Sequence, residues 1–99
     1  MSKISRTRGK HAELAVARYL GVRRNHFEAE DLRHPLLSIE VKHRAKLPQL
    51  VVKAMAQAEA AAEQGKIPVV VMHEAGQEYS KCLVLMRLDE LVGLVGRGE

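Results

Sequence analysis

The amino-acid sequence predicts an α/β fold in which helices flank a mixed β-sheet, and three adjoining segments indicate it. The segment LLSIEVK at 36–42 alternates apolar and polar residues, as a strand with one covered face does. The segment QLVVKAMAQAEAAAEQ at 49–64 follows Pro48, which suits a helix start, and precedes Gly65, which we expect to stop the helix. The segment IPVVVMH at 67–73 is almost continuously apolar, which is typical of a strand covered on both faces.

The rest of the chain completes the order α-β-β-α-β-β-α. Apolar residues recur at helical spacing ahead of Gly21, which we expect to cap the first helix. The segment EAGQEYS at 74–80 is a turn between two apolar runs, so these runs are expected to pair as a hairpin. The further predicted elements are a helix at 9–20, an edge strand at 22–31, a strand at 81–87 and a closing helix at 89–95.

The length of the chain, 99 residues, fits one compact domain spanning 1–99, and 46% hydrophobic residues is a normal share for a globular protein. A domain of this size buries only ~60–65% of its unfolded surface, so its core is marginal. A partner subunit would add stability, which favours an oligomer.

Basic residues are in excess: Lys and Arg number 16 against 12 Asp and Glu, a formal charge of +4. This balance suits a polyanionic partner, although it is also common among small proteins. Two basic clusters flank an acidic centre in the sequence. They are Arg6, Arg8, Lys10, Arg18, Arg23 and Arg24 on one side and Lys42, His43, Arg44 and Lys46 on the other, with Glu28, Glu30, Asp31 and Glu40 between them. Either basic run alone is more simply explained as a solvated surface.

Composition argues against several classes of protein. Cys82 is the only cysteine, so we expect no intrachain disulfide, no Cys-based zinc site and a reducing, cytoplasmic compartment. No stretch approaches the ~20 apolar residues that a membrane span requires. The sequence RGKH at 8–11 lacks the first glycine, the final Ser or Thr and the preceding strand of a P-loop, so no nucleotide cofactor is expected.

A possible catalytic group centres on the strand at 36–42. Glu40 and Lys42 are two residues apart, so they project from the same face, and Asp31 precedes the strand by a short turn that can fold it back alongside. Two carboxylates are a minimal ligand set for Mg²⁺, and a neighbouring lysine can orient water or stabilise charge on a phosphate. Considered alone, an exposed ion-paired strand face explains Glu40 and Lys42 more simply.

The order of these segments along the chain indicates a particular family. The stretch RTRGKHAELAVARYL is followed by AEDLRHPLLSIEVKHR and then by QAEAAAEQGKIPVVVMH. An acidic residue, an E-x-K strand, an Ala-rich helix and an apolar strand thus come in sequence. In this order the chain resembles the PD-(D/E)XK nuclease superfamily over most of its length, and it looks most like the archaeal-type Holliday junction resolvases and their phage relatives.

The resemblance implies a restriction-endonuclease-like core and a specific chemistry. Asp31 and Glu40 would be metal ligands, together with Val41, and Lys42 would be the catalytic lysine. Glu13 on the first helix would complete the catalytic and metal site. The cofactor would be Mg²⁺, with Mn²⁺ able to substitute, and the enzyme would be a two-fold homodimer that hydrolyses DNA phosphodiester bonds in branched DNA such as a four-way junction.

The chain departs from the family pattern at one point. The spacing from Asp31 to Glu40 is short, and Glu30 rather than proline precedes the aspartate, so either Glu30 or Asp31 could be the ligand. The turn at 33–35 can bring Asp31 level with Glu40, which favours Asp31. Glu13 also has a plainer interpretation as a solvent-facing helix residue.

Contacts with DNA are expected mainly at the phosphate backbone, because aromatic residues make up only 3% of the chain and base stacking has few candidates. A flexible basic arm ahead of the first helix would offer charge and backbone N–H groups to phosphates. The residues expected to contact DNA are Arg6, Arg8, Lys10, Arg24, His43, Arg44, Lys46 and Gln57.

The predicted function is therefore a structure-specific DNA endonuclease, most simply a Holliday junction resolvase, which uses metal-activated water and leaves a 5′-phosphate. Two alternatives stay open. One is another PD-(D/E)XK nuclease that acts on flap or duplex DNA. The other is a non-catalytic DNA-binding module in which Asp31, Glu40 and Lys42 merely form surface ion pairs.

Overall fold

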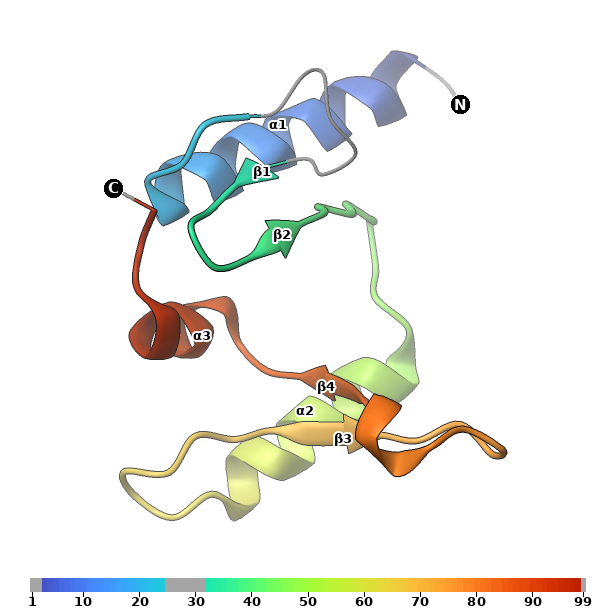
Figure 1. Cartoon of the computed structure of the whole chain (residues 1–99). Coiled ribbons are helices and arrows are strands. Elements are labelled where there is room, and N and C mark those ends of the chain that lie inside the picture. Colours follow the sequence, from blue (N-terminus) through green and yellow to red (C-terminus); the bar gives the residue numbers. More distant parts are fainter. Residues whose placement is uncertain (1–2, 25–31, 99) are drawn as a thin grey trace. The chain divides into compact units, whose positions relative to one another are not determined.

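The chain divides into two compact units, Met1–Ala45 with Leu94–Glu99 and Lys46–Gly93. A computed structural model describes residues 3–24 and 32–98, and the side chains of 8–24 and 32–98 (Figure 1). Each unit has its own long helix and its own pair of antiparallel strands. The predicted mixture of helices and strands is confirmed, and the extent of 1–99 as a single domain stays a prediction.

The sheets differ from the one mixed sheet that we expected. In the part of the chain that the structure describes, strands pair only as two separate antiparallel pairs, β1 with β2 and β3 with β4. The strands are also shorter than the apolar runs that predicted them, because each continues only as far as a partner strand supplies ladder hydrogen bonds.

Helix α1 (Lys3–Leu20) is longer than the predicted 9–20. Arg8 and Lys10 lie within it, as does the backbone of Arg6, so the prediction of a flexible basic arm before the helix is wrong. Arg and Lys are good helix formers, and the helix can absorb the cost of Gly9, about 1 kcal/mol against alanine.

The end of α1 is a Schellman motif, which confirms Gly21 as the cap. Gly21 has φ 68°, its N–H donates to the Arg18 carbonyl at 3.2 Å, and the Val22 N–H donates to the Ala17 carbonyl at 3.0 Å. The chain therefore turns back at this point with the last carbonyls of the helix satisfied.

Strands β1 (Leu32–Arg33) and β2 (Ser38–Ile39) form the sheet of the first unit. They pair antiparallel, with Leu32 opposite Ile39 and Arg33 opposite Ser38. Arg24 adds an antiparallel bridge to Leu32, and the Arg33 N–H donates to the Arg23 carbonyl at 3.2 Å. Of the predicted strand at 22–31, the structure shows only this isolated bridge at Arg24, and residues 25–31 lie outside the described residues. The predicted strand at 36–42 is regular only in β2.

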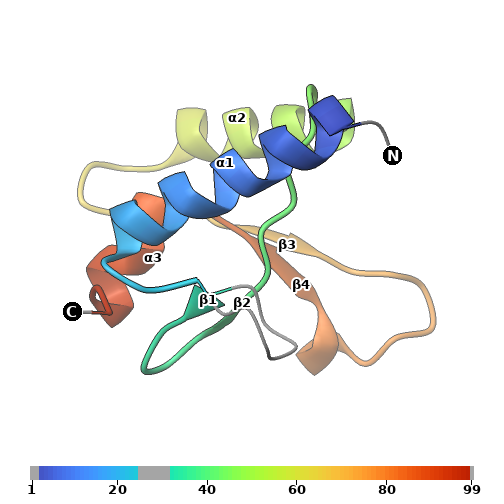
Figure 2. The ribbon, with the colours of Figure 1, turned by 90° about the horizontal axis from the view of Figure 1, so that it is seen from above.

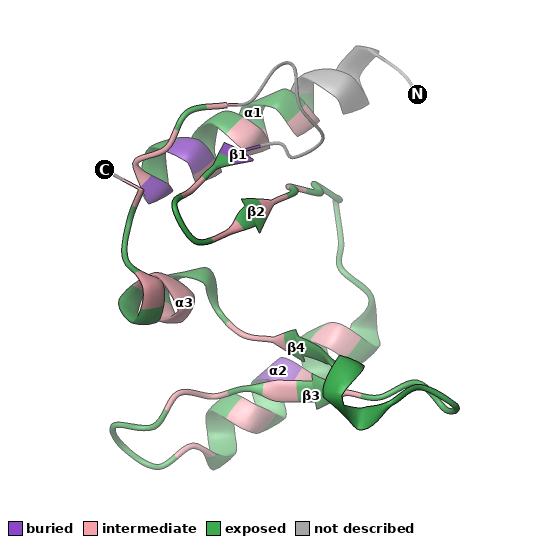
Figure 3. Cartoon of the chain, viewed as in Figure 1, coloured by how far each residue is buried: buried purple, intermediate pink, exposed green. Residues whose placement is uncertain are grey.

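The core of the first unit lies between α1 and β1. Ala17, Leu20 and Leu32 are buried there, the two leucines completely (Figure 3). The C-terminal residues close this core, since the Gly98 N–H donates to the Leu20 carbonyl at 2.8 Å and Arg97 Nη2 donates to the Arg18 carbonyl at 3.2 Å.

His34 connects the β1–β2 turn to the C-terminal residues. Its Nδ1 accepts the Leu36 N–H at 3.0 Å, so this nitrogen carries no proton, and Nε2–H donates to the Gly96 carbonyl at 2.8 Å. The imidazole is therefore the neutral Nε2–H tautomer, and it ties residues from the two ends of the first unit together.

Helix α2 (Gln49–Ala61) opens the second unit after Pro48, as predicted, but ends before residue 64. Ala62 is already extended, with ψ 126°, and its N–H donates to the Ala58 carbonyl. Gly65 has φ 85° in the turn that follows. The glycine therefore forms the turn rather than the cap that stops the helix.

Strands β3 (Val70–Met72) and β4 (Leu83–Leu85) run side by side and confirm the predicted hairpin (Figure 2). Helix α2 contacts β3, and Met55 is the buried residue of the helix. The prediction that both faces of this strand are covered is wrong, because Val71 and its partner Val84 are 63% and 61% exposed. Helix α3 (Leu88–Val95) follows β4 and confirms the predicted closing helix.

An ion pair joins α2 to the segment between β4 and α3. Arg87 Nη2 donates to Glu59 Oε1 at 2.8 Å and Nε donates to Oε2 at 3.1 Å, a two-point arrangement. The hydrogen bond from Arg87 lowers the pKa of the Glu59 carboxyl, and the charge of Arg87 adds to this effect.

We expect Gly98→Ala to destabilise the protein by about 1–2 kcal/mol, because an added Cβ would clash with Val22 Cγ1 and overpacking costs this much. Gly93→Ala is the matched control. Gly93 lies within α3 with open space around it, so the substitution should stabilise by about 0.5–1 kcal/mol. Urea unfolding followed by circular dichroism measures both, and equal effects of the two substitutions would contradict the packing of the C-terminal residues.

We expect the side chain of Glu59 to titrate below the ordinary value of 4.5 in NMR, and at that ordinary value in Arg87→Gln. A lowered folded-state pKa stabilises the fold fully above the unfolded value, and this stabilisation is lost as the pH falls through the folded value. The stability difference between wild type and Arg87→Gln should therefore shrink on acidification below about pH 4.5. A constant difference down to pH 2 would refute the pairing.

Candidate functional site

Glu40 and Lys42 lie just beyond β2, and their side chains meet. Lys42 Nζ is 3.7 Å from Glu40 Oε2, and the two side chains are 78% and 60% exposed. Val41 lies between them and is half-buried. The exposure leaves both charged groups open to a substrate, and the separation is longer than that of a good hydrogen bond.

Asp31 is the carboxylate predicted to act with Glu40. Asp31 and its alternative Glu30 both lie outside the described residues. The described neighbours are informative nevertheless. Leu32 directly follows Asp31 in the chain, and it pairs with Ile39, which directly precedes Glu40.

Glu13 on α1 is held by Arg24. Arg24 Nη2 and Nε both donate to Glu13 Oε2, at 2.9 and 3.2 Å. The side chains of Arg24 and Glu13 are 23% and 25% exposed, so Glu13 is not the solvent-facing residue of the plainer interpretation. The bridge between Arg24 and Leu32 fixes the backbone that carries the guanidinium. Arg24, predicted to contact DNA, thus has an internal partner.

The donor chemistry of these residues suits a hard divalent cation. Carboxylate oxygens are the preferred ligands of Mg²⁺, which usually takes one or two of them and completes its shell with water and substrate phosphates. Glu13 and Glu40 are the described members of the predicted ligand set. Within residues 8–24 and 32–98, no three His, Cys, Asp or Glu side chains gather closely enough to hold a metal by themselves.

The residues expected to contact DNA are spread over both units. Arg8 and Lys10 are exposed on α1, and His43 and Arg44 are exposed after β2. The side chain of Arg6 lies outside the described residues. Lys46 and Gln57 are exposed in the second unit. The structure therefore brings together two pairs from the predicted site, Glu13 with Arg24 and Glu40 with Lys42.

Sequence reasoning counted Arg18 and Arg23 in the first basic cluster, but it did not expect them to gather at the C-terminal end of α1 or to contact a ligand. Arg18 and Arg23 line a hollow there together with Arg24. Arginines close on either side of the predicted cap Gly21 were the available signal, because a Schellman turn brings the residues that flank it to the same end of a helix.

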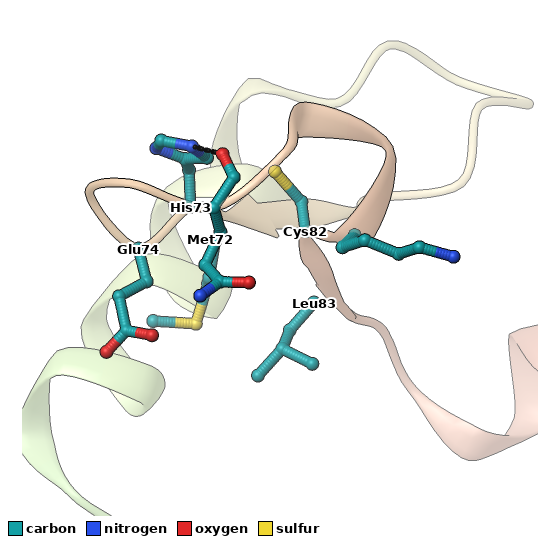
Figure 4. A pocket seen from close by; sticks show the side chains of 7 residues that line it. Met72, His73, Glu74, Cys82 and Leu83 are labelled. Atoms are coloured by element: carbon teal, nitrogen blue, oxygen red, sulfur yellow. Dashed lines mark hydrogen bonds between the residues drawn. The ribbon is translucent and has the colours of Figure 1, made fainter.

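The second unit has a separate pocket of about 440 Å³ beside the loop that joins β3 and β4 (Figure 4). His73 lines it, donates from Nε2–H to the Gln77 carbonyl at 2.8 Å and stacks on Tyr79 with ring centroids 4.2 Å apart. The free thiol of Cys82 also lines it. None of the predicted site residues belongs to this pocket, which is lined by Met72, His73, Glu74, Gln77, Lys81, Cys82 and Leu83.

No protein-family model, characterised protein or solved structure matches the chain. Among the described residues, no helix is both long enough and apolar enough to cross a membrane.

The two ion pairs should differ in strength, because one is partly buried with two hydrogen bonds and the other is exposed with none. In a double-mutant cycle with Glu13→Gln and Arg24→Gln, we expect a coupling of about 1–2 kcal/mol, while Glu40→Gln with Lys42→Gln should give less than about 0.5 kcal/mol. Urea unfolding of the variants measures both couplings. A strong coupling between Glu40 and Lys42 would mean that these two residues stabilise the fold and are not available to a substrate.

Proposed function

We propose that this protein is a Mg²⁺-dependent DNA endonuclease with a restriction-endonuclease-like core of the PD-(D/E)XK type, which cleaves branched DNA, specifically four-way junctions. The observation that supports it most is the exposed pair of Glu40 and Lys42 at the end of the β1–β2 hairpin, 3.7 Å apart. An exposed pair of this kind contributes at most about 1 kcal/mol to stability, so both groups can bind a substrate at little cost to the fold.

The two groups suit complementary tasks at a phosphodiester bond. The Glu40 carboxylate is an acceptor for a cation or for a proton of the attacking water. The Lys42 ammonium donates hydrogen bonds, and it can orient that water or stabilise the negative charge that develops on the phosphate oxygens. Both groups come from one short segment that directly follows β2.

Asp31 is the proposed second carboxylate. It lies outside the described residues, and its choice over Glu30 rests on the sequence pattern and on the resemblance.

Glu13, Glu40 and Asp31 are the residues that would hold Mg²⁺ or Mn²⁺. A bound divalent cation supplies positive charge to the phosphate and favours deprotonation of the attacking water. Arg24 binds Glu13 through Oε2 alone, which fixes the carboxylate while Oε1 takes no part in that pair.

The preference for branched DNA rests on charge and on the resemblance. The formal charge is +4 and aromatic residues are 3%, so recognition through the phosphate backbone is the economical mode. A homodimer would present two such sites to two of the four strands of a junction, and a two-fold axis would match the symmetry of the substrate. The proposed compartment is the cytoplasm.

The non-catalytic DNA-binding module is the competing function, and the same observation supports it. Glu40 and Lys42 lie close enough for a surface ion pair, as do Glu63 and Lys66 in the second unit at 3.4 Å. The two functions differ in one measurable respect, which is whether the charged groups of the first pair are needed for bond cleavage.

We expect the wild type to make paired, symmetric cuts in a labelled four-way junction in Mg²⁺, and none in EDTA. Glu40→Gln and Lys42→Ala should each lower the single-turnover cleavage rate at least ~100-fold while DNA affinity changes little, because they remove groups that act on the reacting phosphate. The matched control is Glu63→Gln with Lys66→Gln, an exposed pair that should leave the rate unchanged.

Other outcomes separate the alternatives. Equal cutting of linear duplex, flap and junction DNA would retain the nuclease and reject the resolvase. Tight binding without cutting in Mg²⁺ or Mn²⁺ would reject the nuclease in favour of the binding module.

A further inference from the structure

A hollow of about 540 Å³ lies at the C-terminal end of α1 in the first unit. Its walls combine apolar side chains with arginines from both sides of the Schellman turn. The lining residues are Leu14, Ala17, Arg18, Val22, Arg23 and Arg24. None of them except Arg24 was expected to contact a ligand.

The arginines of this hollow are not needed to cap the helix. Cations near a helix C-terminus often serve its last carbonyls, but other groups satisfy three of these carbonyls here. The Val22 N–H donates to the Ala17 carbonyl, the Gly21 N–H to that of Arg18, and the Gly98 N–H to that of Leu20. The side chains of Arg18 and Arg23 are therefore not engaged in capping the helix, and they can contact a ligand.

The charge of the hollow is only partly balanced. Arg24 is paired with Glu13, but Arg18 and Arg23 are exposed and form no ion pair with any described carboxylate. Two guanidinium groups next to Leu14 and Val22 make a surface that is cationic on one part and apolar on the other. This combination matches a phosphate joined to a sugar.

We propose that the hollow binds one nucleotide unit of the DNA backbone, with its phosphate on Arg18 and Arg23 and its deoxyribose against Leu14 and Val22. A planar guanidinium can hold two phosphate oxygens at once, which a lysine cannot do. The volume admits a whole nucleotide unit.

This inference rests on the proposed function, and it adds where one nucleotide of the DNA substrate binds. Arg24 lines the hollow and also holds Glu13, so the hollow lies next to the candidate carboxylate of α1. In the proposed function Glu13 holds the metal, and on that basis the nucleotide in the hollow lies near the bond that is cut but is distinct from it. Arg18 and Arg23 are binding residues and take no part in bond cleavage.

The test measures binding of a fluorescein-labelled four-way junction by anisotropy in EDTA, over a series of salt concentrations. Arg18→Gln and Arg23→Gln should each weaken binding about eight-fold near ~0.1 M salt and lower the slope of log K against log salt by ~0.9, since each phosphate contact releases about that many counterions. Lys66→Gln with Lys81→Gln is the control for loss of charge, and it should leave the slope unchanged. Circular dichroism verifies that each variant folds.

A smaller probe tests the hollow directly. Thymidine 3′,5′-bisphosphate should shift the backbone amide resonances of Leu14 and Val22 in the wild type and not in the Arg18→Gln, Arg23→Gln double variant. Shifts that persist in the double variant, or a salt slope that matches the control, would overturn the proposal. If the wild type does not cleave DNA but these binding results hold, the proposed nuclease activity is overturned and the proposed nucleotide site is retained.

Discussion

The burial of Leu20 and Leu32 is the constraint on which the rest of the first unit depends. Each side chain is fully removed from solvent, which is worth roughly 2–3 kcal/mol for a leucine. Leu20 is the last residue of α1 and Leu32 the first of β1, so their burial constrains both the end of the helix and the start of the hairpin. The helix that carries Glu13 and the hairpin that leads to Glu40 thereby share one core in the first unit.

Much of this arrangement follows from the sequence, and the parts that do not have physical reasons. Helical spacing and Gly21 were sufficient to predict the end of α1, and apolar runs were sufficient to predict the β3–β4 hairpin. The start of α1 could not be predicted, because charged residues before Gly9 satisfy a helix and a solvated arm equally well. Strand lengths could not be predicted either, because they depend on where a partner strand stops.

Part of the candidate site could also be predicted from the sequence, and part could not. Spacing alone indicated that Glu40 and Lys42 would share a face, because the side chains of a strand repeat with a period of two. The partnership of Glu13 with Arg24 has no local pattern, since the chain must form both the Schellman turn and the bridge to Leu32 before these residues meet. Pairings of this kind belong to tertiary structure, and a sequence reveals only that both charges are present.

The return of the C-terminal residues to α1 has a consequence for how the chain folds. Residues 46–93 form the second unit between two parts of the first, so the first unit is discontinuous in sequence. Closing it requires Gly98 to find Leu20 across most of the chain, and the entropic cost of such a closure grows with the length of the loop. A second unit that has already formed its local helix and hairpin would shorten that loop. The unit that carries the candidate site is therefore completed by a contact between residues far apart in sequence, which is the kind of contact that slows folding.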